Sequence, residues 1–478
     1  MITTKIIATV GPACWDSSTL AAMITEGVDL LRLNFSHGKL DEHAEAVSRI
    51  RQICHQTGAT VAIIGDLCGP KIRLGRLAGG RCQLQSGQRL AIQRRPVLGT
   101  PARLSTNYPS LVDEVKPPAR ILIDDGQIEL RVLEARPDEL ICQVEVGGEL
   151  GDNKGLNLPD SVISAPSLTE KDRHDLDWAI RQDLDFIALS FVRSADDLRA
   201  LRAILKQHGS GMKVIAKIEK PQAIAHIEPI VAEADAVLVA RGDLGVEMDP
   251  ASVPLLQKEI VLRCRQAGKP AIIATQMLQS MTTAARPTRA EVSDVANAIL
   301  DSADAVMLSA ETSVGQHPVE AVRAINRIAA ETEAFLARTA GHDSQPVTSA
   351  TMRVTSAVVH GANLIARDLA ARLVAIWTET GYTVGLLSKH RLPQPIVGLS
   401  PHPRVCRQME LCYGVEPVCM TRPPDQQEML AQLDQALLAR RLVQPNDLIL
   451  VAAGTALHWP GATNALLIHL VGQPSGQA

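Results

Sequence analysis

The sequence predicts an α/β protein built on a (β/α)8 TIM barrel, with an inserted all-β lid and a C-terminal α/β domain. Eight short apolar segments recur along the chain, and with one gap they alternate with helical patterns. Parallel strands buried on both faces have this near-continuous apolar character, and eight such units close a barrel. The segments are residues 5–11, 30–36, 61–67, 186–191, 213–219, 236–242, 270–275 and 305–311.

Two interruptions divide the chain. Between about Gly69 and Pro166, short alternating segments separated by Gly, Pro and Asp predict an all-β insertion at the catalytic face, where it can act as a lid. A polar break at 339–346 precedes a second helix–strand alternation. A doubly wound sheet has less support, because no glycine-rich fingerprint follows the first strand. The expected domains are a barrel (1–69 and 167–342), a lid (70–166) and a C-terminal domain (347–478).

Composition and charge narrow the function classes. The 478-residue chain has a net charge of −4, no long Lys/Arg run and only 2% aromatic residues, which argues against a nucleic-acid partner. No uncharged apolar run reaches the ~20 residues of a membrane span, and no signal-peptide pattern opens the chain. The nine cysteines are scattered and match no zinc site. We therefore expect reduced thiols in a cytoplasmic protein without a membrane partner.

The stretch from Lys213 to Gly245 carries charges where buried strands should have none. Lys217 and Glu219 lie two residues apart and so share one face of a predicted strand, and Asp243 directly follows the next strand. A cation beside two carboxylates at strand ends indicates a divalent metal and an anionic substrate. A buried salt bridge is the structural alternative.

The second predicted strand adds polar groups at the same end of the barrel. Arg32, Asn34 and Ser36 alternate with Leu33 and Phe35, so the three polar side chains line one face. An arginine at this position is suited to binding a phosphate or a carboxylate in a bidentate manner.

The third and seventh strands end in similar groups. Asp66 lies at the end of the third strand, and Lys71 and Arg73 follow a stiff Gly-Pro turn where the lid departs. These residues are expected at both the catalytic face and the hinge. Thr275 ends the seventh strand, and residues 288–299 predict a capped amphipathic helix that we interpret as mainly structural.

Taken in order, the motifs resemble those of the pyruvate kinase family over essentially the whole chain. Any single motif is weak evidence, but the ordered set is highly specific. The motifs are RLNFSHG, GDLCGPKIR, IDDG, NKGLNLP, SLTEKD, SFVR, KIEKPQ, ARGDLG, ATQMLQSM, PTRAEVSDVANAILDSADAVMLSAET and TETGYT.

The resemblance implies transfer of the phosphoryl group from phosphoenolpyruvate to ADP, giving ATP, with protonation of the remaining enolate to pyruvate. Glu219 and Asp243 match the family's ligands to Mg²⁺ (or Mn²⁺). Lys217 matches the lysine that stabilises the phosphoryl group during transfer, and Thr275 with a water chain is a candidate for the protonation. The implied catalytic residues are Lys217, Arg32 and Thr275, and the substrate-binding residues are Arg32, Lys217, Gly242, Asp243 and Thr275.

The same resemblance implies a nucleotide site that spans the barrel and the lid. One aspartate of the Asp124–Asp125 pair is expected to approach a second metal when the lid closes, and either residue fits. The positions that match the nucleotide and its phosphates are Asn34, Phe35, Ser36, His37, Arg73 and Lys154.

A monovalent-cation pocket is where this chain differs from many family members. Those members hold K⁺ at the positions of Asn34, Ser36, Asp66 and Leu67, and they have Thr and Glu where this chain has Leu67 and Lys71. Because a fixed ammonium repels K⁺ by several kcal/mol in a partly dry site, we expect Lys71 to replace K⁺. Exposure of Lys71 to solvent is the alternative.

The C-terminal domain resembles the family's effector domain. A phosphorylated effector is expected at Thr378, Thr380, Gly381 and Thr383, between a strand and a helix. The opposing loop, residues 458–461, lacks an arginine for a second phosphate, which favours a monophosphate. The alternative is a site kept for subunit contacts, and the family is commonly homotetrameric.

Two other functions remain as alternatives. A Mg²⁺-dependent barrel lyase or aldolase acting on a keto acid would share the metal and arginine positions but would not need a nucleotide-binding lid. A metabolite-sensing scaffold with a dead site is disfavoured, because the catalytic set of residues is present together.

Overall fold

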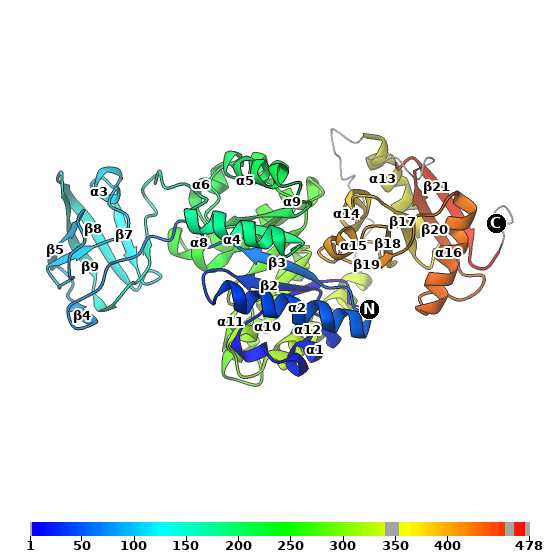
Figure 1. The fold of residues 1–478 in the computed structure, drawn as a ribbon, viewed down its shortest axis with the longest axis horizontal. Coiled ribbons are helices and arrows are strands. Elements are labelled where there is room, and N and C mark those ends of the chain that lie inside the picture. Colours follow the sequence, from blue (N-terminus) through cyan, green and yellow to red (C-terminus); the bar gives the residue numbers. More distant parts are fainter. Residues whose placement is uncertain (1, 340–352, 455–462, 474–478) are drawn as a thin grey trace.

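The computed structural model describes residues 2–339, 353–454 and 463–473. The β-rich insertion, the barrel and the C-terminal α/β domain follow one another along the longest axis of the molecule (Figure 1). The predicted boundary at 342–347 lies outside the described residues. None of the helices in the described ranges combines the length and apolar character needed to cross a bilayer.

Eight parallel strands form a closed barrel, as predicted. Each observed strand lies within its predicted segment, and the predicted segments overrun at their carboxyl ends, where turns or short helices begin. The barrel strands are β1 (Lys5–Thr9), β2 (Leu30–Asn34), β3 (Ala62–Asp66), β12 (Phe186–Leu189), β13 (Lys213–Ile218), β14 (Ala236–Ala240), β15 (Ala271–Ala274) and β16 (Ala305–Leu308).

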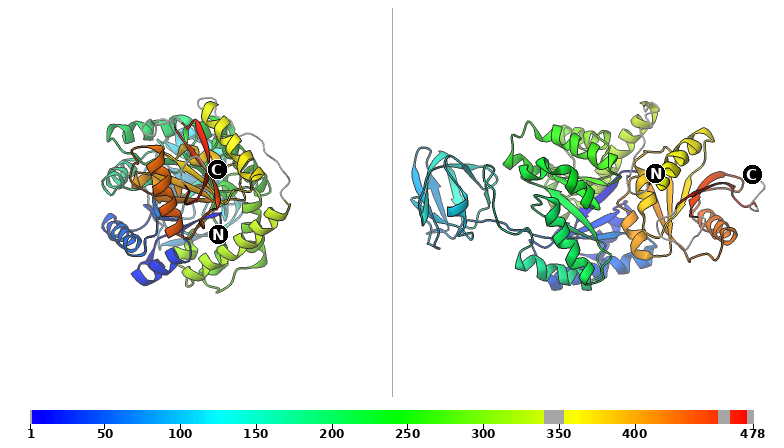
Figure 2. Two further views of the ribbon diagram at one scale, coloured as in Figure 1. Left: turned by 90° about the vertical axis from the view of Figure 1, so that its right-hand side faces the viewer. Right: turned by 90° about the horizontal axis from the view of Figure 1, so that it is seen from above.

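Apolar side chains fill the barrel and join it to a ring of helices. Alternate strand residues such as Ile64, Ile215 and Ile272 form an inner cluster, and the residues between them pack against the helices. Figure 2 (left) shows this ring along the long axis of the molecule. The longer surrounding helices are α1 (Ser17–Thr25), α2 (Leu40–Thr57), α4 (Glu170–Arg181), α5 (Ala195–Gln207), α7 (Ile227–Glu233), α9 (Val253–Gln266), α10 (Arg289–Leu300) and α12 (Pro318–Thr339).

The helix predicted at 288–299 is α10. Its N-cap is Thr288, which forms a capping box with Glu291, as the sequence spacing predicts.

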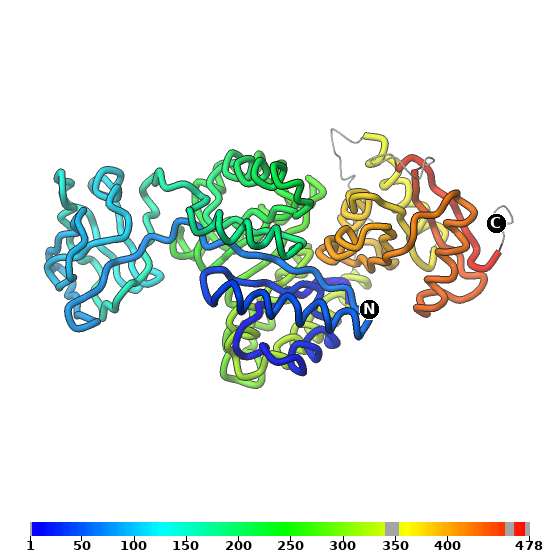
Figure 3. Tube along the Cα trace, viewed as in Figure 1, coloured from blue at the N-terminus to red at the C-terminus, as the bar shows by residue number. Residues whose placement is uncertain are grey.

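The insertion after β3 forms antiparallel and mixed sheets of its own, and two chain segments connect it to the barrel (Figure 3). It also contains a single helical turn, α3 (Leu111–Glu114). Its strands are β4 (Arg81–Leu84), β5 (Arg89–Gln93), β6 (Arg103–Ser105), β7 (Arg120–Ile123), β8 (Ile128–Ala135), β9 (Glu139–Val146), β10 (Gly148–Gly151) and β11 (Leu156–Asn157).

The C-terminal domain is a five-stranded sheet in the order β19-β18-β17-β20-β21, parallel except for the edge strand β21. This agrees with the predicted open, largely parallel sheet. Its strands are β17 (Val374–Trp377), β18 (Ile396–Ser400), β19 (Val415–Cys419), β20 (Leu448–Ala453) and β21 (Ala465–Leu470). Its helices are α13 (Arg353–Asp368), α14 (Tyr382–Ser388), α15 (Pro403–Met409) and α16 (Gln426–Ala439).

This domain docks on the end of the barrel opposite the insertion (Figure 1). Leu411 belongs to the inner apolar cluster of the barrel and is buried. Lys389, which is completely buried, pairs with Asp304 just before β16 at 2.6 Å. Lys5, the first residue of β1, pairs with Glu410 at 3.1 Å. The amino ends of the strands are therefore closed, which leaves the carboxyl ends for chemistry.

Candidate active site

Lys217 lies at the centre of a buried polar cluster at the carboxyl ends of the strands. Its ammonium donates to Ser190 Oγ at 2.7 Å and pairs with Glu219 Oε1 at 2.9 Å and Asp66 Oδ1 at 3.2 Å. Burial alone would lower the pKa of Lys217, but the carboxylates of Asp66 and Glu219 outweigh it and hold that pKa above its usual range. Lys217 is therefore a permanent cation.

Arg32 shares one carboxylate with that lysine. Its Nε and one Nη each lie 2.7 Å from Asp66 Oδ2, and its other Nη donates to Thr9 Oγ1 at 3.1 Å. Burial raises the pKa of Asp66, but Lys217 and Arg32 more than offset it and hold this pKa below its ordinary value. Arg32 and Lys217 thus bring two cationic groups together at the site, and such groups can bind an anionic ligand.

Asp243 forms the other half of the site with Glu219. The chain turns directly from β14 into α8 (Arg241–Glu247), which places Asp243 in the first turn of that helix. Glu219 follows β13 and accepts from the Phe191 N–H at 2.8 Å. Burial, and then the charge of Glu219, raises the pKa of Asp243 to about 6. The two carboxylates are therefore close enough to repel each other.

This donor set fits a divalent cation. Lys217 and Glu219 form a buried ion pair, as the structural alternative requires, but that pair leaves the charge of Asp243 poorly compensated. Among the described residues, no group of three or more His, Cys, Asp or Glu side chains has a metal-binding arrangement. Mg²⁺ is commonly held by one or two carboxylates with water and substrate phosphates, so two carboxylates are sufficient.

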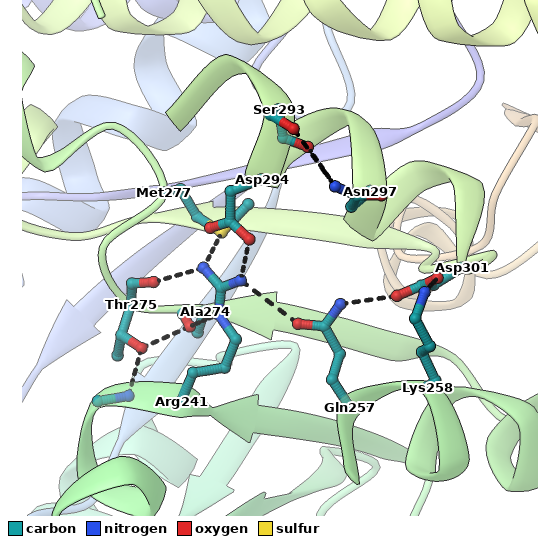
Figure 4. Close-up of polar contacts among 11 residues, drawn as sticks. Arg241, Gln257, Lys258, Ala274, Thr275, Met277, Ser293, Asp294, Asn297 and Asp301 are labelled. Atoms are coloured by element: carbon teal, nitrogen blue, oxygen red, sulfur yellow. Dashed lines mark hydrogen bonds and ion pairs between the residues drawn. The ribbon is translucent and has the colours of Figure 1, made fainter. Parts of the chain in front are cut away.

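Thr275 is held in place by Arg241 (Figure 4). The Thr275 backbone is left-handed, with φ of +71°, an uncommon conformation for a β-branched residue. Arg241 donates to its carbonyl at 2.8 Å and pairs with Asp294 of α10 at 2.6 Å. Thr275 Oγ1 in turn accepts from the Gly242 N–H at 2.7 Å. Gly242 and Thr275, two of the predicted substrate-binding residues, are thus in direct contact.

The residues after β2 form a tight turn beside this cluster. Asn34 Oδ1 accepts from the Ser36 N–H at 3.1 Å, and the His37 N–H donates to the Asn34 carbonyl. Phe35 is buried against His43 and Trp178.

The four predicted monovalent-cation positions lie at or just after the ends of the neighbouring strands β2 and β3. Asn34 pairs in register with Asp66 across β2 and β3. The Leu67 carbonyl accepts from Ser190 Oγ at 2.8 Å, and Asp66 is bound by Arg32 and Lys217. Protein donors therefore already occupy the Asp66 carboxylate and the Leu67 carbonyl, the oxygen atoms with which these two residues could bind K⁺.

A cleft separates the insertion from the barrel. Lys71 and Asp125 from the insertion and Asp243 from the barrel all line it. The Lys71 side chain is exposed, as the alternative to replacement of K⁺ expects, although its charge still acts to lower the pKa of Asp243. Asp124, the neighbour of Asp125, is instead paired with Lys154 at 2.8 Å.

The predicted nucleotide residues fall into two groups, one in the turn at 34–37 after β2 and the other, Arg73 and Lys154, in the insertion. Arg73 donates to the Asn153 carbonyl at 3.0 Å, and Lys154 binds Asp124, so both are bound within the insertion. In the part of the chain that the structure describes, no hydrogen bond or ion pair joins them to the turn at 34–37.

The predicted effector residues lie between β17 and the first turn of α14. Thr378 Oγ1 accepts from the Gly381 N–H at 2.9 Å, and Gly381 is left-handed with φ of +78°. Thr383 Oγ1 lies 2.8 Å from Thr463 Oγ1, and the Tyr382 N–H donates to Thr380 at 3.4 Å. The opposing loop at 458–461 lies outside the described residues.

Comparisons with known proteins identify the family. The model of the pyruvate kinase barrel domain matches residues 1–322, and that of the pyruvate kinase alpha/beta domain matches residues 356–469. The chain belongs to the pyruvate kinase family. Pyruvate kinases of Corynebacterium efficiens and Mycobacterium tuberculosis are 41% and 40% identical to it, with 98% of each chain covered. The crystal structure of a pyruvate kinase from Cryptosporidium parvum, 34% identical, superposes with a TM-score of 0.93 over 98% of this chain and 96% of its own.

Family membership confirms the predicted pyruvate kinase function and fold, and the chain is a phosphotransferase rather than a keto-acid lyase. Several residues around the site had not been singled out from the sequence. Arg241 and Asp294 are 53 residues apart, and α10, interpreted as mainly structural, supplies Asp294. Ser190 was missed because a serine after a strand carries no distinctive signal, although the SFVR motif contains it.

Proposed function

We propose that the protein transfers the phosphoryl group of phosphoenolpyruvate to ADP through the cluster centred on Lys217. The observation that carries this assignment is a permanent ammonium held among Asp66, Ser190 and Glu219 at the carboxyl ends of the strands. Phosphoryl transfer depends on positioning and charge neutralisation, and this cluster supplies both.

Each side chain has a role that its contacts support. Lys217 and Arg32 stabilise the negative charge of the phosphoryl group, and Asp66 orients both of them. Glu219 and Asp243 hold Mg²⁺ (or Mn²⁺), which supplies further charge neutralisation when bound. The Gly242 N–H and Thr275 Oγ1 face the substrate carboxylate, and Thr275 is the candidate that moves a proton to the enolate through water.

The nucleotide lies between the barrel and the lid. Its phosphates contact Asn34, Phe35, Ser36, His37, Arg73 and Lys154 once the lid closes over the cleft. Asp125 approaches the second metal, because it lines the cleft while Asp124 is already paired with Lys154. The division into a barrel (1–69 and 167–342), a lid (70–166) and an effector domain (347–478) follows from this arrangement.

A coupled assay of pyruvate formation tests the reaction. ADP-dependent release of pyruvate is expected, whereas release without ADP would indicate a lyase. Lys217→Met should lower turnover by about 10³-fold or more, because a charge that acts in the transition state is lost. Lys206→Met, at an exposed position on α5, is the matched control and should keep full activity. Retained turnover in a folded Lys217→Met protein would refute the role of Lys217.

Lys71 makes the enzyme independent of K⁺. Lys71 and Asp243 line the same cleft, the Lys71 charge acts on Asp243, and Arg32 and Lys217 already pair with Asp66. Turnover in tetramethylammonium buffer should therefore change by less than two-fold (about 0.4 kcal/mol) when K⁺ is added. Lys71→Glu should create K⁺ activation. Strong activation of the wild-type protein by K⁺ would contradict this role.

The C-terminal domain binds a monophosphate effector, such as a sugar monophosphate or AMP, at Thr378, Thr380, Gly381 and Thr383. The hydroxyls and the left-handed Gly381 support a phosphate at this loop. Titrating each ligand, with fructose 1,6-bisphosphate as the comparison, against the substrate saturation curve tests the choice. The oligomer is a homotetramer, as in the family, and analytical ultracentrifugation measures it.

A further inference from the structure

A second ion pair runs beside the carboxylates at which the metal is expected. Lys220 directly follows Glu219, and Glu247 lies one helical turn after Asp243 on α8. The Lys220 ammonium pairs with Glu247 Oε1. Lys220 and Glu247 therefore tie the segment after β13 to α8, immediately behind Glu219 and Asp243.

The pair is enclosed by the protein. The side chain of Glu247 is 1% exposed and that of Lys220 is 20% exposed. The Lys220 ammonium also lies 5.6 Å from the centre of the Phe191 ring, and the Phe191 N–H binds Glu219. A buried carboxylate needs such a partner, because leaving it unpaired costs about 3–5 kcal/mol.

The lid reaches the same carboxylate. Asn157 of β11, within the NKGLNLP motif, donates from Nδ2 to Glu247 Oε1 at 2.8 Å. The other oxygen, Glu247 Oε2, is buried without a hydrogen-bond partner among the described residues. Glu247 is thus a point at which a lid side chain contacts the helix that carries Asp243.

We propose that Lys220, Glu247 and Asn157 form a positioning triad that holds Asp243 opposite Glu219 and transmits the lid contact to them. The inference rests on the proposed metal role of Glu219 and Asp243. Side chains that orient metal ligands typically change metal affinity by 10- to 100-fold when they are removed. A triad of this kind makes cation affinity depend on a contact made by the lid.

The test is direct Mn²⁺ binding to the full chain without nucleotide, measured from the electron paramagnetic resonance of free Mn²⁺. Lys220→Met should weaken Mn²⁺ binding about ten-fold. Lys220→Arg, which keeps the charge, should stay within about two-fold of the wild type, as should the exposed-lysine control Lys206→Met. The direction of the change in Mn²⁺ affinity separates two roles of Lys220. If Lys220 were only a nearby positive charge, its removal would strengthen Mn²⁺ binding, because like charges repel.

Further variants separate the lid contact, folding and the metal site. Asn157→Leu should weaken Mn²⁺ binding by a smaller factor, about three-fold, because Glu247 keeps Lys220. If Lys220→Met unfolds, the double variant Lys220→Met/Glu247→Leu replaces the pair with apolar groups and should show the same ten-fold loss. Unchanged or tighter Mn²⁺ binding in folded Lys220→Met, or in the double variant where the single one unfolds, would overturn the triad. Asp243→Asn should abolish binding, and its failure to do so would instead refute the proposed metal site.

Discussion

Replacing Arg241 tests whether this side chain maintains the strained backbone of Thr275. A left-handed conformation costs a β-branched residue about 1–3 kcal/mol, so it persists only where other contacts enforce it. Arg241 provides these contacts by donating to the carbonyls of Ala274 at 3.3 Å and Thr275 at 2.8 Å, while Asp294 fixes its guanidinium (Figure 4). In Arg241→Met the backbone should relax, and Thr275 Oγ1 should leave the Gly242 N–H.

The expected loss follows from that strain. About 2 kcal/mol corresponds to a fall of roughly thirty-fold in kcat/KM for phosphoenolpyruvate. The assay varies phosphoenolpyruvate at saturating ADP and Mg²⁺, and thermal unfolding confirms that each variant is folded. Arg241→Lys should be intermediate, because lysine keeps the charge beside Asp294 but lacks the planar fork.

A double-mutant cycle isolates the strain from other effects of Arg241. Glycine adopts the φ of +71° at position 275 without a Cβ penalty, although it removes the hydroxyl. In a Thr275→Gly background, Arg241→Met should therefore cost much less than in the wild type, so the two losses should not add. Fully additive losses, or a kcat/KM of Arg241→Met within two-fold of the wild type, would refute the reasoning.

Three stability predictions concern other parts of the fold. Lys389→Met should lower the free energy of unfolding by about 3–5 kcal/mol in urea titrations, because Asp304, 2% exposed, loses its closest cation. Burial raises the pKa of Glu410 from 4.5 to about 8. Between these two pH values the folded protein holds a proton on Glu410 that the unfolded chain has lost, so the free energy of unfolding should fall as the pH rises from about 4.5 to about 8. Glu410→Gln should flatten this fall in urea titrations at each pH. Thr288→Ala removes the N-cap of α10 and should cost about 1 kcal/mol by the same measurement, and an unchanged midpoint would contradict the cap.

The barrel could be predicted because its signals are local. A strand buried on both faces must be apolar throughout, so a charge at its end, such as Lys217, is conspicuous. Because Lys217 and Glu219 lie two residues apart, the sequence predicted that they share a face of the strand. In the structure the Lys217 ammonium lies 2.9 Å from Glu219 Oε1. The conformation of Thr275 could not be predicted, because it depends on Arg241, a residue from another strand end.

The charged contacts at the amino ends of the barrel strands could not be predicted from the sequence either, although they follow a repeat. An aspartate immediately precedes every second barrel strand, and its carboxylate accepts a backbone N–H near the start of the strand before it. The pairs are Asp29 with Ile6 at 2.7 Å, Asp185 with Ile63 at 2.9 Å, Asp235 with Val214 at 2.8 Å and Asp304 with Ala271 at 2.8 Å. This repeat could not be predicted from the sequence, because single aspartates at irregular intervals carry no visible period.

This repeat helps to explain why the amino ends of the barrel strands bind the C-terminal domain whereas the carboxyl ends carry the candidate active site. Each of the four aspartates also pairs with a cation, and for two of them the C-terminal domain supplies it: Arg407 binds Asp185 at 2.6 Å and Lys389 binds Asp304 at 2.6 Å. The four aspartate carboxylates at the amino ends are therefore already engaged, by backbone N–H groups and by cations that include two from the C-terminal domain. At the carboxyl ends, no lysine or arginine among the described residues forms an ion pair with Asp243, and burial with the charge of Glu219 raises its pKa. This carboxylate therefore remains available to a bound cation.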